Sequence, residues 1–409
     1  MQTIPHAIAS PPLRAALIVM MTISGVVLVE PAPFDILVAV FFTMFVICGR
    51  LKLPTVMRLP LGLLAAFLFF NCASAVHALD NTAFARFFFI NVYMVVIFFL
   101  IAGIVYTWRD GAQIVYKGYL ASCVLIGSIS LFAFFSVYYP ELVSVNGRLK
   151  GTFKDPNVFA PFMVLGILYC LLRIEECKRR FVLIYFSYIV LLSFCVVLSA
   201  SRGAWLNLSV AVVAYLLARV GQTSCSGVSA TRIVVLILVA GLAGSVVVAA
   251  VDYAHLGEFL AMRAQMQEYD ESRFALQGLG LQMAMNNLLG YGPGQFEGEL
   301  GSTAWTGSNA AHSLFVRLLF ENGVGGFLSF IAFLGFSLAV ALRLATIPWR
   351  FRGLACVSGS SLIGGIVNSA VIDTLHWRHL WVQLGITWGL YVLYRRARLR
   401  VTFVPPGLP

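Results

Sequence analysis

An arginine at position 202 stands where the sequence leaves almost no room for a solvated loop. Arg202 lies in the segment 199–205, directly between two long apolar runs. An arginine so close to a membrane boundary must reach water, pair with an acid or bind a ligand anion. Its planar guanidinium can hold two phosphate oxygens at once, which a lysine ammonium cannot do. Arg202 could therefore bind a phosphate-bearing substrate, and a structural ion pair with an acidic neighbour is the alternative.

His312 opens an apolar, helix-like segment directly after the polar residues Ser308 and Asn309. A helix start at the membrane interface is exposed yet close to the membrane, and the histidine ring titrates near neutral pH. These two properties would suit a base or a hydrogen-bond donor. The alternative is an isolated histidine without a role in chemistry.

Arg273 follows acidic residues at 268–271 and begins a predicted outer helix. It could bind a substrate anion, or it could pair with these acids on the surface. The acids could instead suggest a metal site, but they form no DxD pattern and have no clustered histidines beside them, so we predict no metal. The eight cysteines also lack metal-ligand spacing and predict no disulfide framework.

Nine basic residues fall on the side of the membrane where basic residues are disfavoured, so each needs a reason to be there. They are Arg86, Arg148, Lys150, Lys154, Arg202, Arg263, Arg273, Arg317 and Arg378. Among them, Arg148, Lys150, Arg317 and Arg378 are predicted to bind substrate.

The elements that hold these residues are predicted to be transmembrane helices. Of the 409 residues, 60% are hydrophobic and 11% are charged, whereas about a quarter of the residues in a soluble chain are charged. A bilayer core needs about 20 apolar residues in a helix. The sequence predicts an all-α polytopic membrane protein, one integral membrane domain over residues 1–409 with about twelve spans. These lie at 15–29, 34–48, 61–79, 87–106, 118–138, 159–172, 181–198, 205–217, 233–251, 325–342, 353–372 and 380–394.

The distribution of charge predicts the orientation of the spans. With both termini in the cytoplasm, the inner segments hold most of the 28 basic residues, and nearly all of the 17 acidic residues lie outside. This asymmetry is typical of a multi-pass protein of the bacterial inner membrane. The net charge of +11 is thereby explained by contact with anionic membrane lipids, and it does not indicate a nucleic-acid partner.

Two outer segments are predicted to carry function. The loop at 253–322 is long enough to contain its own structure, and its spacing predicts helices at 258–266 and 273–289, then a tight turn at 290–294. The shorter segment 140–157 is polar. It ends with Asp155 and Pro156, which predict an N-cap and the first residue of a helix.

Four stretches in this order resemble the O-antigen ligase and O-antigen polymerase superfamily over residues 145–340. The stretches are 148–153 with 155–157, 199–206, Arg273 with 290–296, and His312-Ser313 with 321–325. The resemblance implies a GT-C-like architecture and a metal-independent, inverting glycosyltransferase without a cofactor. Its donor would be an undecaprenyl-diphosphate-linked glycan on the periplasmic face. Arg202 and Arg273 would then hold the diphosphate, and His312 would act near the acceptor, so these three are the predicted catalytic residues.

The acceptor is less strongly specified than the donor. The spacing from His312-Ser313 to Gly323 resembles ligases, which use lipid A–core, but exopolysaccharide polymerases, which extend a growing polysaccharide, show a similar arrangement. We predict O-antigen ligation and keep polymerisation as the alternative. A transporter of lipid-linked sugars is a more distant alternative, because the sequence has no internal repeat and its polar residues gather on one face.

Overall fold

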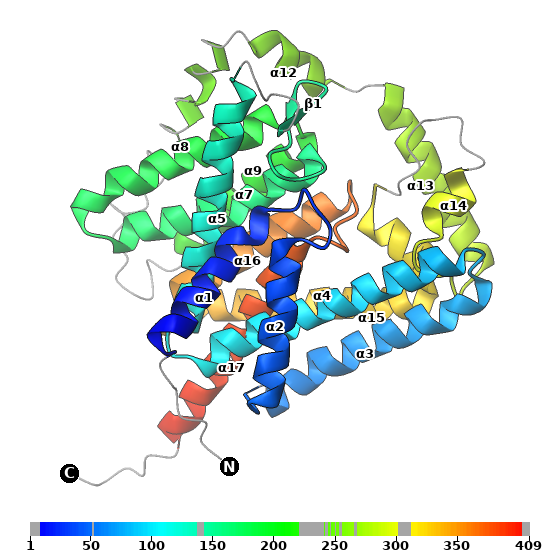
Figure 1. Cartoon of the computed structure of the whole chain (residues 1–409), viewed down its shortest axis with the longest axis horizontal. Coiled ribbons are helices and arrows are strands. Elements are labelled where there is room, and N and C mark those ends of the chain that lie inside the picture. Colours follow the sequence, from blue (N-terminus) through cyan, green and yellow to red (C-terminus); the bar gives the residue numbers. More distant parts are fainter. Residues whose placement is uncertain are drawn as a thin grey trace.

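The computed structural model describes residues 9–50, 53–136, 143–220, 241, 244–245, 247–249, 251–252, 256–265, 268–301 and 312–402. Helices account for nearly all of its regular structure (Figure 1). The first half of the chain forms α1 (Pro11–Thr22), η1 (Ile23–Gly25), α2 (Pro33–Ile47), η2 (Thr55–Met57), α3 (Arg58–Ala73), η3 (Ser74–His77), α4 (Asn81–Thr107), α5 (Gly111–Phe134), α7 (Pro156–Glu176), η4 (Arg179–Phe181), α8 (Val182–Leu198) and α9 (Arg202–Val220). The second half forms α12 (Gly257–Ala264), α13 (Glu268–Asn286), α14 (Phe296–Gly301), α15 (Leu314–Thr346), α16 (Arg352–Ser369) and α17 (Arg378–Thr402).

Seven of the described helices are long and apolar enough to cross a membrane. Five of them are α4, α5, α7, α9 and α15. The other two are continuous helices at Thr55–His77, which joins η2, α3 and η3, and at Arg179–Leu198, which joins η4 and α8. Two shorter apolar helices lie at Pro11–Gly25 and Pro33–Ile47, and α16 and α17 are helical where the last two spans were predicted. The span predicted at 233–251 lies mostly outside the described residues. The structure thus supports an all-α membrane protein, while the count of twelve spans stays a prediction.

Small residues let the longest helices pack closely. Gly385 and Gly389 of α17 are four residues apart and face α4, where a Cβ on Gly385 would lie 2.8 Å from the carbonyl oxygen of Phe98. A Cβ on Gly389 would lie 2.6 Å from the Cβ of Val105. Such a spacing of small residues is typical of helix contacts within membranes, because it lets the two backbones approach. Helices α4 and α17 therefore pack closely against each other.

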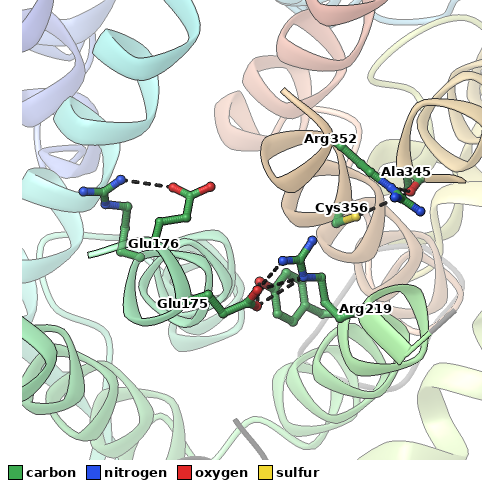
Figure 2. Close-up of polar contacts among 8 residues, drawn as sticks. Glu175, Glu176, Arg219, Ala345, Arg352 and Cys356 are labelled. Atoms are coloured by element: carbon green, nitrogen blue, oxygen red, sulfur yellow. Dashed lines mark hydrogen bonds and ion pairs between the residues drawn. The ribbon is translucent and has the colours of Figure 1, made fainter. Parts of the chain in front are cut away.

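A buried ion pair joins α7 to α9 at the end of the bundle that the charge distribution places in the cytoplasm. Figure 2 shows Arg219 of α9 reaching Glu175 of α7, and the Tyr215 hydroxyl donates to the same carboxylate at 2.7 Å. Nearby, the Arg352 Nε donates to the Ala345 carbonyl oxygen at 2.9 Å. Charged groups inside a membrane protein must be paired. This pair holds one end of α9, and Arg202 is the first residue at the other end.

Local signals predicted some helix ends and missed others. Helix α7 begins at Pro156 with Asp155 as its N-cap, whose side chain accepts from the Asn157 amide, so this prediction is confirmed. Helix α15 begins at Leu314, eleven residues before the predicted span at 325–342, and is interrupted at Gly323 (φ 62°). The predicted boundary at 325 came from the polar residues at 317 and 321–322, which the structure buries inside the helix bundle instead.

Candidate functional site

Four arginines line a cavity of about 280 Å³. Arg148 comes from the β1–β2 hairpin, Arg202 from α9, Arg263 from α12 and Arg273 from α13. The far end of α16 and the residues after it complete the wall, with the Asn368 amide as a polar group. Among the described lining residues, Asp270 is the acidic one, so the cavity has a strong excess of positive charge. Such a site can bind a multiply charged anion.

Arg202 is held against Asp270, which lies 68 positions further along the chain. Its Nη2 lies 2.5 and 2.6 Å from the two Asp270 carboxylate oxygens, and its Nη1 donates to the Gln265 carbonyl oxygen at 2.9 Å. The Asp270 side chain is 7% exposed and that of Arg202 is 29% exposed. The ion pair with an acidic neighbour, which the sequence left open, is therefore present. The arginine still reaches the cavity.

The short connection before α9 brings Arg202 to the cavity. Helix α8 ends at Leu198 and α9 begins at Arg202, with Ala200 in the left-handed region (φ 48°). Gly203 then faces α16, where a Cβ would lie 2.6 Å from the Asn368 Oδ1. A Cβ at this position would require the Asn368 side chain to move. The Ser-Arg-Gly stretch thus works as a corner that packs α9 against α16 and leaves the arginine at the site.

A two-residue hairpin positions Arg148. Strands β1 (Ser144–Val145) and β2 (Arg148–Leu149) pair in antiparallel fashion around Asn146 (φ 49°) and Gly147 (φ 71°). This dipeptide favours a type I′ hairpin turn because both of its residues tolerate positive φ. The Arg148 Nε donates to the Ser199 carbonyl oxygen at 2.9 Å, and its Nη2 donates to the Asn157 Oδ1 at 2.8 Å. The hairpin, the start of α7 and the α8–α9 corner are thereby joined at one point.

His312 lies beside the cavity and is connected to it through Gln277. Arg273 and Gln277 are one turn apart on α13, and both line the cavity. The Gln277 Nε2 donates to the His312 carbonyl oxygen at 3.1 Å, and His312 itself is in the left-handed region (φ 44°). Burial lowers the pKa of His312 to about 4, and the positive charges of Arg273 and Arg317 contribute while Asp373 opposes them. The imidazole is therefore neutral near pH 7 and can accept a proton.

The other predicted substrate-binding residues lie outside the described lining of this cavity. Arg317 is buried, and its guanidinium meets Asp373 at 2.8 Å, Glu297 at 2.9 Å and Glu321 at 3.6 Å. Its charge is thus compensated within the protein. The role of Arg317 in substrate binding stays a prediction.

Arg378 and Lys150 are also absent from the described lining of the cavity. The Arg378 Nε and Nη2 each donate at 2.7 Å to one oxygen of Asp35, and the Tyr93 hydroxyl donates to Asp35 at 2.6 Å. Lys150 follows β2, and its amide donates to the Val143 carbonyl oxygen at 2.7 Å. Substrate binding by these two residues likewise stays a prediction.

The glycine-rich turn after α13 supplies hydrogen-bond partners for backbone groups around the break in α15. Because Gly323 interrupts the helix, nearby backbone groups need partners outside it. The Tyr291 amide donates to the Phe320 carbonyl oxygen at 2.9 Å, the Gly292 amide donates to the Glu321 carbonyl oxygen at 2.8 Å, and the Val324 amide donates to the Leu288 carbonyl oxygen at 2.9 Å. The two stretches at 290–296 and 321–325 are therefore one structural unit.

Gln295 attaches this unit to the start of α4. Its Oε1 accepts from the amides of Leu79 and Asp80 at 3.1 and 2.9 Å, and its Nε2 donates to the Asp80 carbonyl oxygen at 2.9 Å. Asp80 in turn caps α4 through the amides of Thr82 and Ala83. These contacts fix α13 and the start of α15, and with them Arg273 and His312.

We expect Gly290→Ala to destabilise the protein. Gly290 has φ 89°, and a Cβ there would lie 2.4 Å from the Gly323 amide nitrogen. A non-glycine residue held in an unfavourable backbone region costs about 1–3 kcal/mol before any steric clash is added. Thermal unfolding of the purified protein in detergent should show a lower Tm. The matched control is Gly335→Ala in α15, where a Cβ meets nothing within 4 Å; equal Tm values for the two variants would contradict the proposed unit.

Sequence reasoning missed several residues of the site that the structure reveals. Asp270 was considered as a surface partner of Arg273 or as a metal ligand, but it is the partner of Arg202. Asn157 was noted only as part of the stretch 155–157, and Gln277 was not singled out, although they contact Arg148 and His312. One available signal was the Asn146-Gly147 dipeptide, which predicts a hairpin and so the direction of Arg148. Within the described residues, no three histidine, cysteine, aspartate or glutamate side chains are grouped to hold a metal ion.

Residues 187–331 match the model of a family described as O-Antigen ligase. This match confirms the resemblance to the O-antigen ligase superfamily. It covers Arg202, Arg263, Asp270, Arg273 and His312, whereas the hairpin with Arg148 precedes it. No curated protein matches the chain. The match shows that this part of the chain, which includes α9, α12, α13 and the first half of α15, is similar to the O-antigen ligase family.

Proposed function

Starting from the relation of residues 187–331 to O-antigen ligases, we propose that this protein moves a glycan from undecaprenyl diphosphate to an acceptor. The acceptor we favour is lipid A–core. We place the protein in the bacterial inner membrane with both termini in the cytoplasm and the cavity on the periplasmic face. The observation that carries the proposal is the convergence of Arg148, Arg202, Arg263 and Arg273 on one cavity with a neutral histidine beside it.

The arginines would stabilise the leaving group. As the acceptor oxygen attacks the anomeric carbon, the bond to the diphosphate oxygen breaks and the diphosphate leaves with the electron pair. Charge-assisted hydrogen bonds from guanidinium groups stabilise this developing charge, and they can do so without a divalent cation. Arg202 would exchange Asp270 for the diphosphate when the donor binds. A single displacement of this kind inverts the anomeric configuration.

His312 would act on the acceptor. A sugar hydroxyl is a poor nucleophile, and a neutral imidazole can accept its proton as the new glycosidic bond forms. The lowered pKa of His312 keeps the ring neutral in the empty site. A bound diphosphate would offset the charge of Arg273, so we expect the pKa of His312 to rise towards its ordinary value in the donor complex. Holding donor and acceptor in one cavity also lowers the activation barrier, because the two reactants no longer have to be brought together from solution.

Polymerisation is the second candidate, because His312 followed by Gly323 is also compatible with the polymerase branch of the superfamily. Purified full-length protein with a labelled undecaprenyl-diphosphate glycan tests both. Labelled lipid A–core supports ligation, and a longer carrier-linked glycan supports polymerisation. Movement of intact donor across a vesicle membrane without a new glycosidic bond would instead identify a transporter.

We expect glycan transfer to be unaffected by a chelator. In the proposed mechanism the arginines supply the charge that a divalent cation provides in other transferases. Initial rates measured with and without excess EDTA should therefore agree. Loss of activity in EDTA and its return with Mg²⁺ would overturn metal independence, and Asp270 and Glu271 would then be the first ligands to test.

A further inference from the structure

A second groove in the helix bundle shares no lining residue with the arginine cavity and is lined by one lysine, three tyrosines and apolar side chains. This groove, which we call the Lys117 groove, has a volume of about 460 Å³ and lies between α5, α7 and α8. Helix α5 contributes Lys117 at one end and Leu125 and Ile129 at the other. Three tyrosines, Tyr169 of α7 with Tyr185 and Tyr188 of α8, complete its wall.

The charge available in the groove belongs to Lys117. Its side chain is exposed, and no carboxylate among the described residues pairs with it. Arg173 lies beside the groove, with its guanidinium 5.7 Å from the centre of the Tyr185 ring, but it is compensated by Glu176 at 3.1 Å. The Lys117 end therefore offers one ammonium group and several tyrosine hydroxyls. These groups suit a phosphodiester anion.

The length of the groove matches one leaflet of a bilayer. From Lys117 to Ile129, α5 advances twelve residues, or about 18 Å. Half of the hydrocarbon core is about 15 Å thick. Leu125 and Ile129 are 44% and 49% exposed, and exposure of such side chains on a membrane helix means contact with lipid. Gly127 lets α8 approach α5, since a Cβ there would lie 3.3 Å from the Cys195 Sγ.

We propose that the Lys117 groove binds an anionic glycerophospholipid. The phosphodiester would lie between Lys117 and the tyrosine hydroxyls, and an acyl chain would follow α5 to Ile129. Basic groups between transmembrane helices on the cytoplasmic side are known to recognise anionic headgroups, and the charge distribution puts Lys117 on that side. The site is separate from the arginine cavity, and the proposal does not depend on which reaction the protein catalyses.

Native mass spectrometry of the purified full-length protein tests the proposal. Phosphatidylglycerol and phosphatidylcholine with identical acyl chains are added in turn, so that only the headgroup charge differs. Wild type should retain phosphatidylglycerol in preference to phosphatidylcholine. Lys117→Gln should lower phosphatidylglycerol binding by about fivefold, the effect of one basic residue near a membrane surface, and leave phosphatidylcholine binding unchanged.

Two further variants separate the headgroup from the chain. Lys178→Gln removes an exposed lysine that the charge distribution puts on the same side but that lies outside the groove, and it should bind both lipids like wild type. Leu125→Trp fills the apolar end and should weaken binding of both lipids. The proposal is overturned if wild type shows no headgroup preference, if Lys178→Gln loses as much as Lys117→Gln, or if Leu125→Trp binds both lipids normally. Size-exclusion profiles matching that of wild type establish that each variant is folded.

Discussion

Replacing Arg202 with alanine should slow glycan transfer by about 30-fold to several thousand-fold. Removing one partner of a charge-assisted hydrogen bond in a partly buried site costs roughly 2–5 kcal/mol. If this cost is added to the activation free energy, it gives the stated decrease in rate. Arg202→Lys should not rescue the loss, because an ammonium group cannot present the planar fork that meets two phosphate oxygens. Affinity for the carrier-linked donor should fall in both variants, as measured by binding of labelled donor and by initial rates.

The matched control is Arg86→Ala. Arg86 belongs to the same set of outer cations, but its side chain is 69% exposed and its carboxylate partner Glu30 is 4.0 Å away, so it should transfer glycan like wild type. Full donor binding by Arg202→Ala would contradict the diphosphate contact. In that case the ion pair with Asp270 would be the structural role of Arg202, namely to hold α13 against α9.

His312→Ala should lose about 10²- to 10⁴-fold in transfer while still binding the donor, because a positioned general base typically contributes that much. Donor binding is expected to survive because the arginines that line the cavity are unchanged. The two variants therefore separate donor binding from chemistry. Near-normal transfer by His312→Ala would exclude a general base, and a structural role at the start of α15 would remain.

The pH dependence of wild type gives a second readout of His312. The pKa of about 4 means that the ring stays neutral as pH falls from 8 to about 5, so protonation should not reduce kcat/KM over that interval. The acidic limb of kcat/KM should lie near pH 4, below the ordinary histidine value of about 6.5. The limb of kcat should lie at higher pH, because kcat reports the donor complex. If the acidic limbs of kcat and kcat/KM lay at the same pH, this would argue against the electrostatic link between His312 and the diphosphate.

Local signals and long-range contacts explain which parts of the fold the sequence could predict. The start of α7 was predictable because an N-cap aspartate followed by proline acts within three residues. The start of α15 at Leu314 agrees with the helix predicted to open at His312, but the span predicted at 325–342 omits its first turns, because averaged hydropathy treats Arg317, Glu321 and Asn322 as polar loop residues. The charge of the buried Arg317 is compensated by Glu297 and Asp373, which lie 20 and 56 residues away along the chain.

The same distinction applies to the site. Arg148, Arg202 and Arg273 could be singled out because a basic residue on the disfavoured side of a membrane requires an explanation. Their convergence could not be derived, since the hairpin, the α8–α9 corner and α13 meet only in the folded chain. Asp35, the carboxylate that pairs with Arg378, is 343 residues away, so this ion pair could not be predicted from the sequence. Spacing identifies charged residues in unusual places, but only the fold decides which of them remain available for a ligand.

The interruption of α15 at Gly323 sets the depth at which the proposed reaction would occur. The helix has 33 residues and extends about 50 Å, while the hydrocarbon core measures about 30 Å. The part that follows Gly323 is long enough to cross alone, so we propose that the boundary between water and hydrocarbon lies at the break. A carrier diphosphate held at this boundary keeps its isoprenoid tail immersed. Glycan transfer then avoids the work of extracting the tail, which would be about 0.8 kcal/mol for each CH₂ group drawn into water.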